Sequence, residues 1–292
     1  MLAGSSGTKR TLIPPTDAPR AVSTETAAGE RRVRVGLVGM GYIGSALHEL
    51  IRDRFGALLE VAFVFDLDPG RLEGCRPEEV LDDLGRFGER QADLIVEAAT
   101  AEVTRAHGLA FLAAGDYLPL SLSALVDPAL ERALSECAEH AGTRLLIPHG
   151  ALAGLEGLEE RRGSWESVTV TFRKDPLHID FASVGGRPEI DGPTTLVDGS
   201  VREAARAYPR NLNAMIAAGL ASGGLDRCRG IFVAEPGLDV HVAELDARAV
   251  DGSELRICKR QRIAGVSGTE LPDAVIHSIL RATSPGIGMQ IV

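Results

Sequence analysis

The segment that most constrains the fold is "VRVGLVGMGYIGSALHELI", which begins at Val33. Its opening residues alternate and are rich in β-branched side chains, as in a strand. A glycine-rich turn follows, and then Ile43, Leu47, Leu50 and Ile51 recur at helical spacing. A strand, a tight turn and a helix in this order are typical of the first unit of a parallel sheet covered by helices.

The turn has the spacing GxGxxG and consists of Gly39, Met40, Gly41, Tyr42, Ile43 and Gly44. The first glycine permits the tight turn, the second lets a pyrophosphate approach the backbone, and the third lets the helix pack close to the strand. Free N–H groups at the start of the helix stabilise the pyrophosphate. We therefore interpret the motif as a dinucleotide-binding turn, with a purely structural turn as the alternative.

The next predicted strand, in "LEVAFVFDLDPGRL", ends at Asp66. An acidic residue about 20 residues after the glycine motif binds the ribose hydroxyls of NAD. A carboxylate at this place repels a 2′-phosphate, so the cofactor is NAD or NADP, with NAD favoured. The alternative is that Asp66 only belongs to the turn-forming Asp-Leu-Asp-Pro sequence.

Strands and helices keep alternating up to Pro148. "ADLIVEAAT", "DYLPLSLSAL" and "TRLLIP" are the third, fourth and fifth predicted strands. The helix 128–141 has the clearest ends, because Asp127 caps it, Pro128 takes its first position and Gly142 ends it. This alternation predicts a doubly wound parallel sheet of the Rossmann type with helices on both faces.

The pattern changes after Pro148, and we predict a second α+β domain built on a mainly antiparallel sheet. "SVTVTFRK" alternates, and "CRGIFVAE", "LDVHVAELDARAV" and "SELRICKRQRI" follow as consecutive antiparallel strands. Ser200 and Glu203 have the spacing of a capping box. The predicted parts are a disordered tail (1–31), a Rossmann domain (32–148), the α+β domain (149–268), and a C-terminal helix and tail (269–292) that pack back on the Rossmann domain.

Composition excludes several classes of protein. A chain of 292 residues suits two domains, and its net charge of −10 argues against nucleic-acid binding. The four cysteines lack metal-ligand spacing, which favours reduced thiols in a cytoplasmic protein without a metal site. No apolar run reaches the length of a membrane-spanning helix. A mitochondrial presequence, interrupted by Asp17, Glu25 and Glu30, is the alternative for the N-terminal tail.

Three further segments carry candidate ligand-binding groups. His241 lies in the strand-like "GLDVHVAEL", where spacing alone fits either a core histidine or a proton-handling group. "IPHGALAGLEGL" (147–158) follows the fifth strand at the edge where ligands bind in open sheets, with an ordinary linker as the alternative. Asn211 and Asn213 lie at a helix start, where one is expected to cap the helix and the other is free for a ligand.

In order along the chain, "VGLVGMGYIGSAL", "IPHGALAGLEGL", "YPRNLNAMIAAGLA" and "IFVAEPGLDVHVAEL" resemble the L-aspartate dehydrogenase family, including its animal "aspartate dehydrogenase domain-containing" branch. The resemblance runs from Val33 to the C-terminus. It implies an NAD(P)-dependent enzyme that reversibly converts L-aspartate to oxaloacetate and ammonia. It also implies a homodimer that associates through the sheet of the second domain.

The resemblance implies roles for single residues. The histidine of the family's Asn-x-His element is catalytic, and His241 falls on it. The family's cofactor contacts carry over to Ala151 and Asn213, with Asn211 as a further candidate. Asp239 stands where the bacterial and archaeal enzymes usually have asparagine, which bears on the substrate.

Two other departures are Glu235 for the usual aspartate and His149 for the common serine. Two alternatives therefore stay open: an oxidoreductase acting on another amino or keto acid, and a catalytically silent dinucleotide-binding protein.

We expect His241 to act as general acid and base, with Asp239 on the same strand face raising its pKa. A dicarboxylate substrate needs cationic or polar partners, for which Arg210, Lys174 and His149 are candidates. Most of the remaining histidines lie on predicted helix surfaces or in loops, and these are expected to be solvated. The remaining histidines are His48, His107, His140, His178 and His277.

Overall fold

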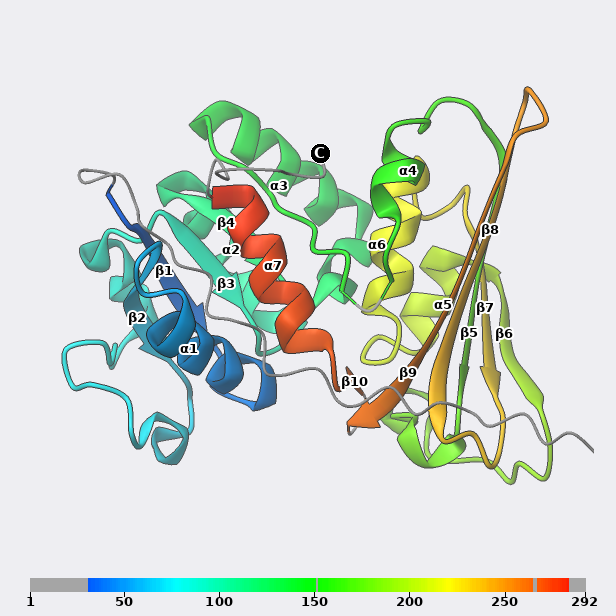
Figure 1. Cartoon of the computed structure of the whole chain (residues 1–292), viewed down its shortest axis with the longest axis horizontal. Helices are drawn as coiled ribbons and strands as arrows, with labels where there is room; N and C mark the ends of the chain where they lie inside the picture. The colour runs from blue at the N-terminus through cyan, green and yellow to red at the C-terminus, as the bar shows by residue number, and fades with distance from the viewer. Residues whose placement is uncertain (1–30, 151, 265–266, 284–292) are drawn as a thin grey trace, which may run out of the picture. The chain divides into compact units, whose positions relative to one another are not determined.

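Two β-sheets, one in each half of the chain, organise the structure (Figure 1). The computed structural model describes residues 31–150, 152–264 and 267–283. The predicted tail therefore lies outside the described residues except for Arg31, and so does Ala151. Among the helices of the described ranges, none combines the length and the apolar character needed to cross a membrane.

The first sheet confirms the predicted Rossmann-type architecture. Its strands are all parallel and follow the order β2-β1-β3-β4. They are β1 (Val33–Val38), β2 (Leu59–Phe65), β3 (Leu94–Glu97) and β4 (Asp116–Pro119). β2 lies on one side of β1 and β3 on the other, so the strand order reverses at β1. Sheets of this kind bind ligands at such a reversal point.

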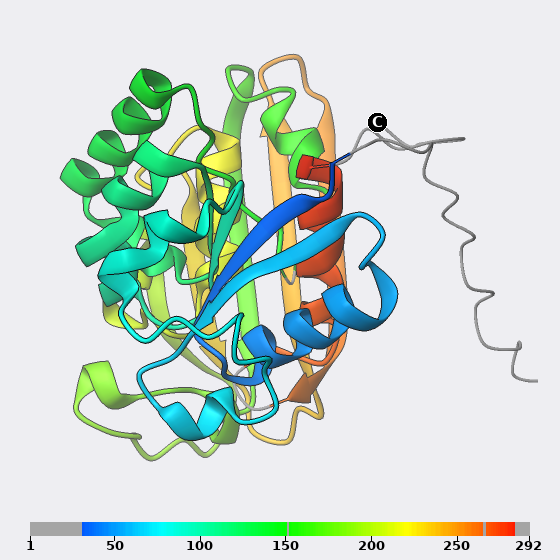
Figure 2. The ribbon, with the colours of Figure 1, turned by 90° about the vertical axis from the view of Figure 1, so that its left-hand side faces the viewer.

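Helices cover both faces of this sheet, as Figure 2 shows. They are α1 (Tyr42–Arg54) and α7 (Leu271–Thr283) on one face, and α2 (Ala101–Ala114) and α3 (Pro128–Ala141) on the other. Leu47 of α1 and Ile276 of α7 share one buried cluster, so the C-terminal helix packs against the first half of the chain. Asp127 accepts a hydrogen bond from the Ala129 N–H, and Gly142 ends α3 with φ +68°, which confirms the predicted caps.

The predicted fifth strand is wrong as an extended element. Only Leu145 of "TRLLIP" joins the sheet, through an isolated bridge to Tyr117. The Tyr117 N–H donates to the carbonyl of Arg144, and the Leu146 N–H donates to the carbonyl of Tyr117. Pro148 has no N–H to continue the ladder, and the chain leaves this sheet for the second one.

The second sheet has the order β10-β9-β8-β5-β7-β6 and is mainly antiparallel, as predicted. Its strands are β5 (Trp165–Lys174), β6 (Thr194–Ser200), β7 (Arg229–Ala234), β8 (Val240–Ala249), β9 (Glu254–Ala264) and β10 (Ser267–Gly268). The prediction of consecutive antiparallel strands was wrong for β7, which pairs with β5 in parallel and lies away from β8. Parallel neighbours need a crossover, and the helices between β6 and β7 provide it.

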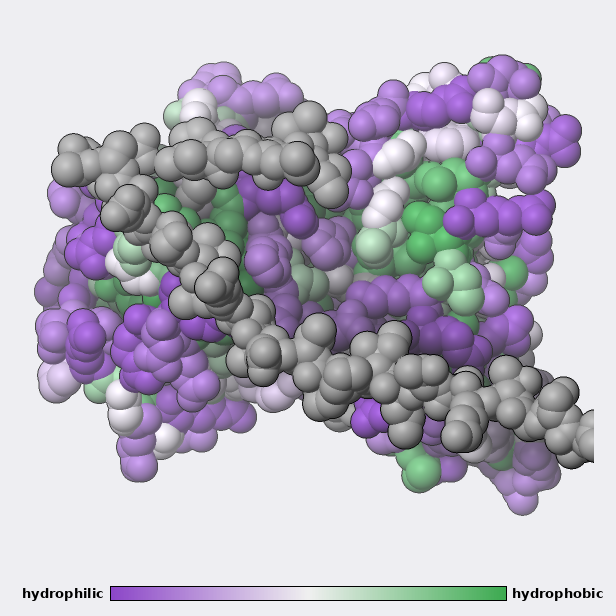
Figure 3. Space-filling view, viewed as in Figure 1, coloured by the Kyte–Doolittle hydropathy of each residue, from purple (hydrophilic) through white to green (hydrophobic). Residues whose placement is uncertain are grey.

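These helices are α5 (Val201–Ala207) and α6 (Asn213–Ser222), and a short α4 (Leu155–Glu159) precedes β5. Ser200 and Glu203 form the predicted capping box at the start of α5. Met215 of α6 shares a buried cluster with Leu125, which follows β4, so one core connects α6 to the first half of the chain. Figure 3 shows hydrophobic residues on the visible face over the part that holds α6 and β9.

Candidate active site

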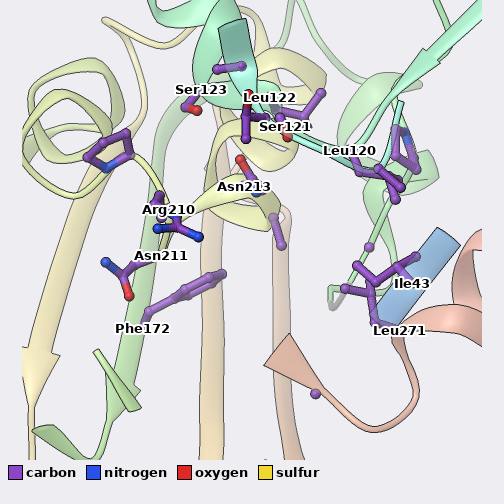
Figure 4. A pocket seen from close by; sticks show the side chains of 18 of the residues that line it. Ile43, Leu120, Ser121, Leu122, Ser123, Phe172, Arg210, Asn211, Asn213 and Leu271 are labelled. Atoms are coloured by element: carbon purple, nitrogen blue, oxygen red, sulfur yellow. The ribbon is translucent and has the colours of Figure 1, made fainter. Parts of the chain in front are cut away.

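A cavity of about 550 Å³ lies where the segments that follow β3 and β4 meet strands β5, β8 and β9. Its volume is in the range of small-molecule sites, and its position at the carboxyl ends of parallel strands is the expected one. Figure 4 shows Asn213 between the Ser121–Ser123 segment and a group formed by Arg210, Asn211 and Phe172. Ile43, from the start of α1, lies at another part of the lining.

His241 extends from β8 into this lining and is only 5% exposed. Its Nε2 is buried and has no hydrogen-bond partner among the described residues. Burial, followed by the positive charges of Lys174 and His178, lowers its pKa to about 3. The imidazole is therefore neutral at physiological pH and presents an unused ring nitrogen at the cavity.

The proposed support of His241 by Asp239 was wrong in direction, because the pKa of the imidazole is lowered and not raised. Asp239 is exposed and lies outside the cavity lining. The strand β8 begins only at Val240, after a turn and a bend, so the alternation of a strand does not extend to Asp239. The titratable neighbours of His241 are instead Lys174 and His178.

Lys174 is the last residue of β5, and its side chain reaches the cavity although the residue is 4% exposed. Its Nζ donates a hydrogen bond to the carbonyl of Asn211 over 3.1 Å. Burial lowers its pKa to about 8. At neutral pH the amine is thus mainly a cation, and it loses this charge as the pH rises through about 8.

The two asparagines differ in what their amides do. Asn211 donates to the carbonyl of Asp180 over 2.8 Å and accepts from the N–H of Asp180 over 3.0 Å, so its amide holds a loop in place. Asn213 also lines the cavity, and its Oδ1 is buried without a partner among the described residues. Neither caps α6, as was expected of one of them, because Leu212 occupies the N-cap position.

The other substrate candidates have different surroundings. Arg210 lines the cavity, has a side chain that is 73% exposed, and pairs with Asp180 over 3.1 Å. His149 is half-buried, its Nδ1 has no hydrogen-bond partner in the described ranges, and burial lowers its pKa. It lies outside the lining itself, although Pro148 and Gly150 on either side contribute to it. The prediction of a solvated histidine was wrong for His48, which is buried. His178 is half-buried and lies edge-on to His241.

The glycine turn has the geometry that its sequence predicts. Gly39 has φ +95°, where a side chain is strained, and a Cβ on Gly44 would lie 1.8 Å from the carbonyl oxygen of Gly39. A Cβ on Gly41 would meet only the Arg71 guanidinium, at 3.6 Å. The backbone at Gly41 is thus open to a ligand, whereas Gly39 and Gly44 are required by the turn itself.

Asp66 directly follows β2 and lies beside this turn. Its Oδ2 accepts a hydrogen bond from the Met40 N–H over 2.7 Å, and its Oδ1 accepts one from the Asp68 N–H. The guanidinium of Arg71 lies 3.7 Å from the same Oδ2. Asp66 therefore helps to fix the glycine turn and places a carboxylate beside it.

The sequence reasoning missed Glu97, a buried acid at the end of β3 beside the cavity. Its position follows the same pattern as Asp66, because both acids come at or just after the carboxyl end of an apolar parallel strand. That pattern could have identified it. Gln261 of β9, also buried and in the lining, had no distinguishing signal in the sequence.

Known protein families match both halves of the chain. The family described as "Aspartate dehydrogenase, C-terminal" matches residues 158–264, and "Homoserine dehydrogenase, NAD binding domain" matches residues 39–148. A protein of Danio rerio named aspartate dehydrogenase domain-containing protein is 30% identical, over 86% of this chain and 95% of its own length. An L-aspartate dehydrogenase of Ruegeria pomeroyi is 35% identical, over 76% of this chain and 81% of its own length.

A solved structure has the same fold. The crystal structure of aspartate dehydrogenase from Thermotoga maritima superposes with a TM-score of 0.69 at 23% identity, covering 89% of this chain and all of that one. At 23% identity, this similarity shows that the two chains share a fold across both sheets.

Proposed function

The chain belongs to the aspartate dehydrogenase family, and we propose that it catalyses the NAD(P)-dependent, reversible deamination of L-aspartate to oxaloacetate and ammonia. The observation that carries the proposal is the buried Nε2 of His241, which has no hydrogen-bond partner among the described residues and lies in a cavity that Ile43 of the glycine turn also lines. A neutral imidazole with a free nitrogen is suited to move a proton at the substrate.

The residues present fit a dinucleotide. Gly41 leaves its backbone open, and the buried Oδ1 of Asn213 has no partner in the described part of the chain. In the proposal, the turn Gly39–Gly44 receives the pyrophosphate, Asp66 the adenosine ribose, and Asn213 the nicotinamide end. NAD is favoured over NADP because the carboxylate of Asp66 repels a 2′-phosphate. When bound, the cofactor accepts the hydride that leaves the substrate α-carbon.

The neutral His241 is ready to accept a proton from the ammonium group of the substrate, or from the water that later adds to the carbon. Two substrate carboxylates in the cavity raise its proton affinity, because opposite charges favour the imidazolium. In the reverse direction the same nitrogen returns the proton. His241 therefore serves as base and acid without the carboxylate partner that the sequence suggested.

Lys174 and Arg210 are proposed to bind the two carboxylates. Lys174 is buried and held by the carbonyl of Asn211, so it offers a cation with a fixed position. Arg210 is mostly exposed and already pairs with Asp180, so its contribution is smaller. His149 and Ala151 border the same edge of the sheet, and roles in substrate and cofactor binding, respectively, are proposed for them on the resemblance.

We further propose that the chain is a cytoplasmic homodimer. The face of the second sheet opposite His241 carries exposed charges of both signs, including Asp246 and Arg248 of β8 and Arg256 of β9. Charges of both signs on one face allow it to pair with the same face of a second copy about a two-fold axis. The division into domains at residue 148 also remains a proposal.

The direct test mixes the full-length protein with NADH, oxaloacetate and ammonium and follows the loss of NADH. Turnover that depends on both oxaloacetate and ammonium supports the proposal. Turnover only with other 2-oxo acids favours an oxidoreductase for another amino or keto acid. NADH binding without turnover of any acid in the panel favours a silent dinucleotide-binding protein.

A further inference from the structure

Glu97 ends β3 with a side chain that is 0% exposed. Its Oε1 accepts hydrogen bonds from the Ala99 N–H over 2.7 Å and from the Ser121 hydroxyl over 2.9 Å. Its Oε2 accepts one from the Ser121 N–H over 3.0 Å. A single carboxylate thus joins the segment after β3 to the segment after β4.

Both joined segments form a wall of the cavity. Residues 98–102, which follow β3, and residues 120–123, which follow β4, line it. Figure 4 shows Ser121 and Leu122 facing the region of Asn213. Because Ile43 of the glycine turn borders the same cavity, a dinucleotide that starts at the turn continues along this wall.

We propose that Glu97 is a positioning residue for the dinucleotide, whose ionised carboxylate holds the two wall segments in the conformation that receives the nicotinamide end. The inference rests on the cofactor part of the proposed function and is independent of the substrate. Glu97 lies behind the wall and outside the lining, so it acts through Ala99 and Ser121.

The neighbours of the carboxylate explain why its charge matters. In the sheet, Glu97 lies opposite Val38 of β1 and Pro119 of β4, both apolar. The phenol of Tyr117 is engaged with Thr104 over 2.8 Å, and its pKa is raised by burial and then by the charge of Glu97. The three hydrogen bonds that hold the carboxylate come from neutral donors, and such bonds are strongest when the acceptor is charged.

Burial raises the pKa of Glu97 to about 6, against the opposing effect of its hydrogen bonds. The group is therefore mostly ionised at pH 7.5 and gains a proton as the pH falls through about 6. An added proton removes the negative charge, which weakens the three hydrogen bonds that join the wall segments. NADH affinity is then expected to fall as the pH is lowered through this range.

The experiment measures the dissociation constant of NADH by calorimetry between pH 5.5 and 8, with the full-length protein and two variants. Glu97→Gln is expected to bind NADH about tenfold more weakly at pH 7.5, because its amide group faces a donor. It should also lose the part of the pH dependence centred near pH 6. The matched control is Glu79→Gln, which removes another buried carboxyl that bonds to His48 and lies outside the cavity lining. Glu79→Gln should bind NADH as the unaltered protein does.

Thermal unfolding shows whether each variant is folded. If Glu97→Gln does not fold, Ser121→Ala replaces it, since this change removes one donor and keeps the carboxylate. It should weaken NADH binding about twofold to threefold. The inference is overturned if Glu97→Gln keeps the affinity and pH profile of the unaltered protein, if Glu79→Gln weakens binding equally, or if the substitute Ser121→Ala has no effect. Failure of the unaltered protein to bind NADH would instead overturn the proposed function.

Discussion

The Nζ of Lys174 and the main-chain carbonyl of Asn211 lie 3.1 Å apart and form a buried hydrogen bond. The bond connects the end of β5 to the residues just before α6, which begins at Asn213. It therefore fixes the position of Asn213 relative to the sheet that carries His241.

The first prediction concerns the pH dependence of catalysis. Because burial lowers the pKa of Lys174 to about 8, its charge is lost as the pH rises through that value. We expect kcat/KM for oxaloacetate to fall above about pH 8 and to show no acidic limb near 6.5 from His241. In Lys174→Arg, which stays charged, the basic limb should move to higher pH. A basic limb that stays near pH 8 in this variant would assign the titration to another group.

The two asparagines provide a matched pair. Asn213→Ala should weaken NADH binding about tenfold with little effect on stability, because the lost Oδ1 bonds to no described residue. Asn211→Ala should instead lower the free energy of unfolding by roughly 1–3 kcal/mol, because it leaves the Asp180 backbone groups unpaired. Calorimetric titration with NADH and denaturant unfolding of both variants separate the two roles. The reverse pattern would contradict the assignment.

Two glycines of the turn are expected to respond differently to the same methyl group. Gly44→Ala places a Cβ 1.8 Å from the carbonyl oxygen of Gly39 and should destabilise the fold by several kcal/mol. Gly41→Ala meets only the end of the Arg71 side chain, so it should fold normally and yet lose NADH affinity. Thermal unfolding and NADH titration measure both effects. Unchanged NADH affinity in a folded Gly41→Ala protein would place the pyrophosphate elsewhere.

Asp66 is expected to set the cofactor preference. Replacing it by Asn removes the charge that repels a 2′-phosphate, so kcat/KM for NADP relative to NAD should rise roughly tenfold, equivalent to about 1.4 kcal/mol. Asp68→Asn is the control, because Asp68 is a nearby exposed acid that bonds the Gly70 N–H. Equal changes in the two variants would mean that net charge, and not the position of Asp66, decides the preference.

Much of this arrangement could be predicted from local sequence. The turn from Gly39 to Gly44 and the ends of α3 at Asp127 and Gly142 follow from backbone chemistry that a short segment fixes by itself. The placement of His241 at the cavity followed from the family resemblance. The turn and the helix ends depend on residues that are close together in the chain. The place of His241 depends on motifs that occur in the same order as in the family.

What could not be predicted depends on partners distant in sequence. The place of β7 beside β5 is a matter of sheet order, which alternation along one strand does not specify. The lowered pKa of His241 comes from burial and from Lys174, which lies on another strand. The burial of His48 arises from its contact with Glu79, 31 positions later. Such contacts become visible only once the chain is folded.

The most direct test of the account compares the unaltered protein with His241→Ala in two assays: NADH affinity, and NADH oxidation with oxaloacetate and ammonium. The variant should bind NADH within about twofold of the unaltered protein, because the proposed cofactor contacts are made by the glycine turn and Asn213 and not by His241. Its kcat should fall by about 10² to 10⁴, the usual contribution of a general acid and base. An unchanged kcat in the variant would remove His241 from the reaction and contradict the account.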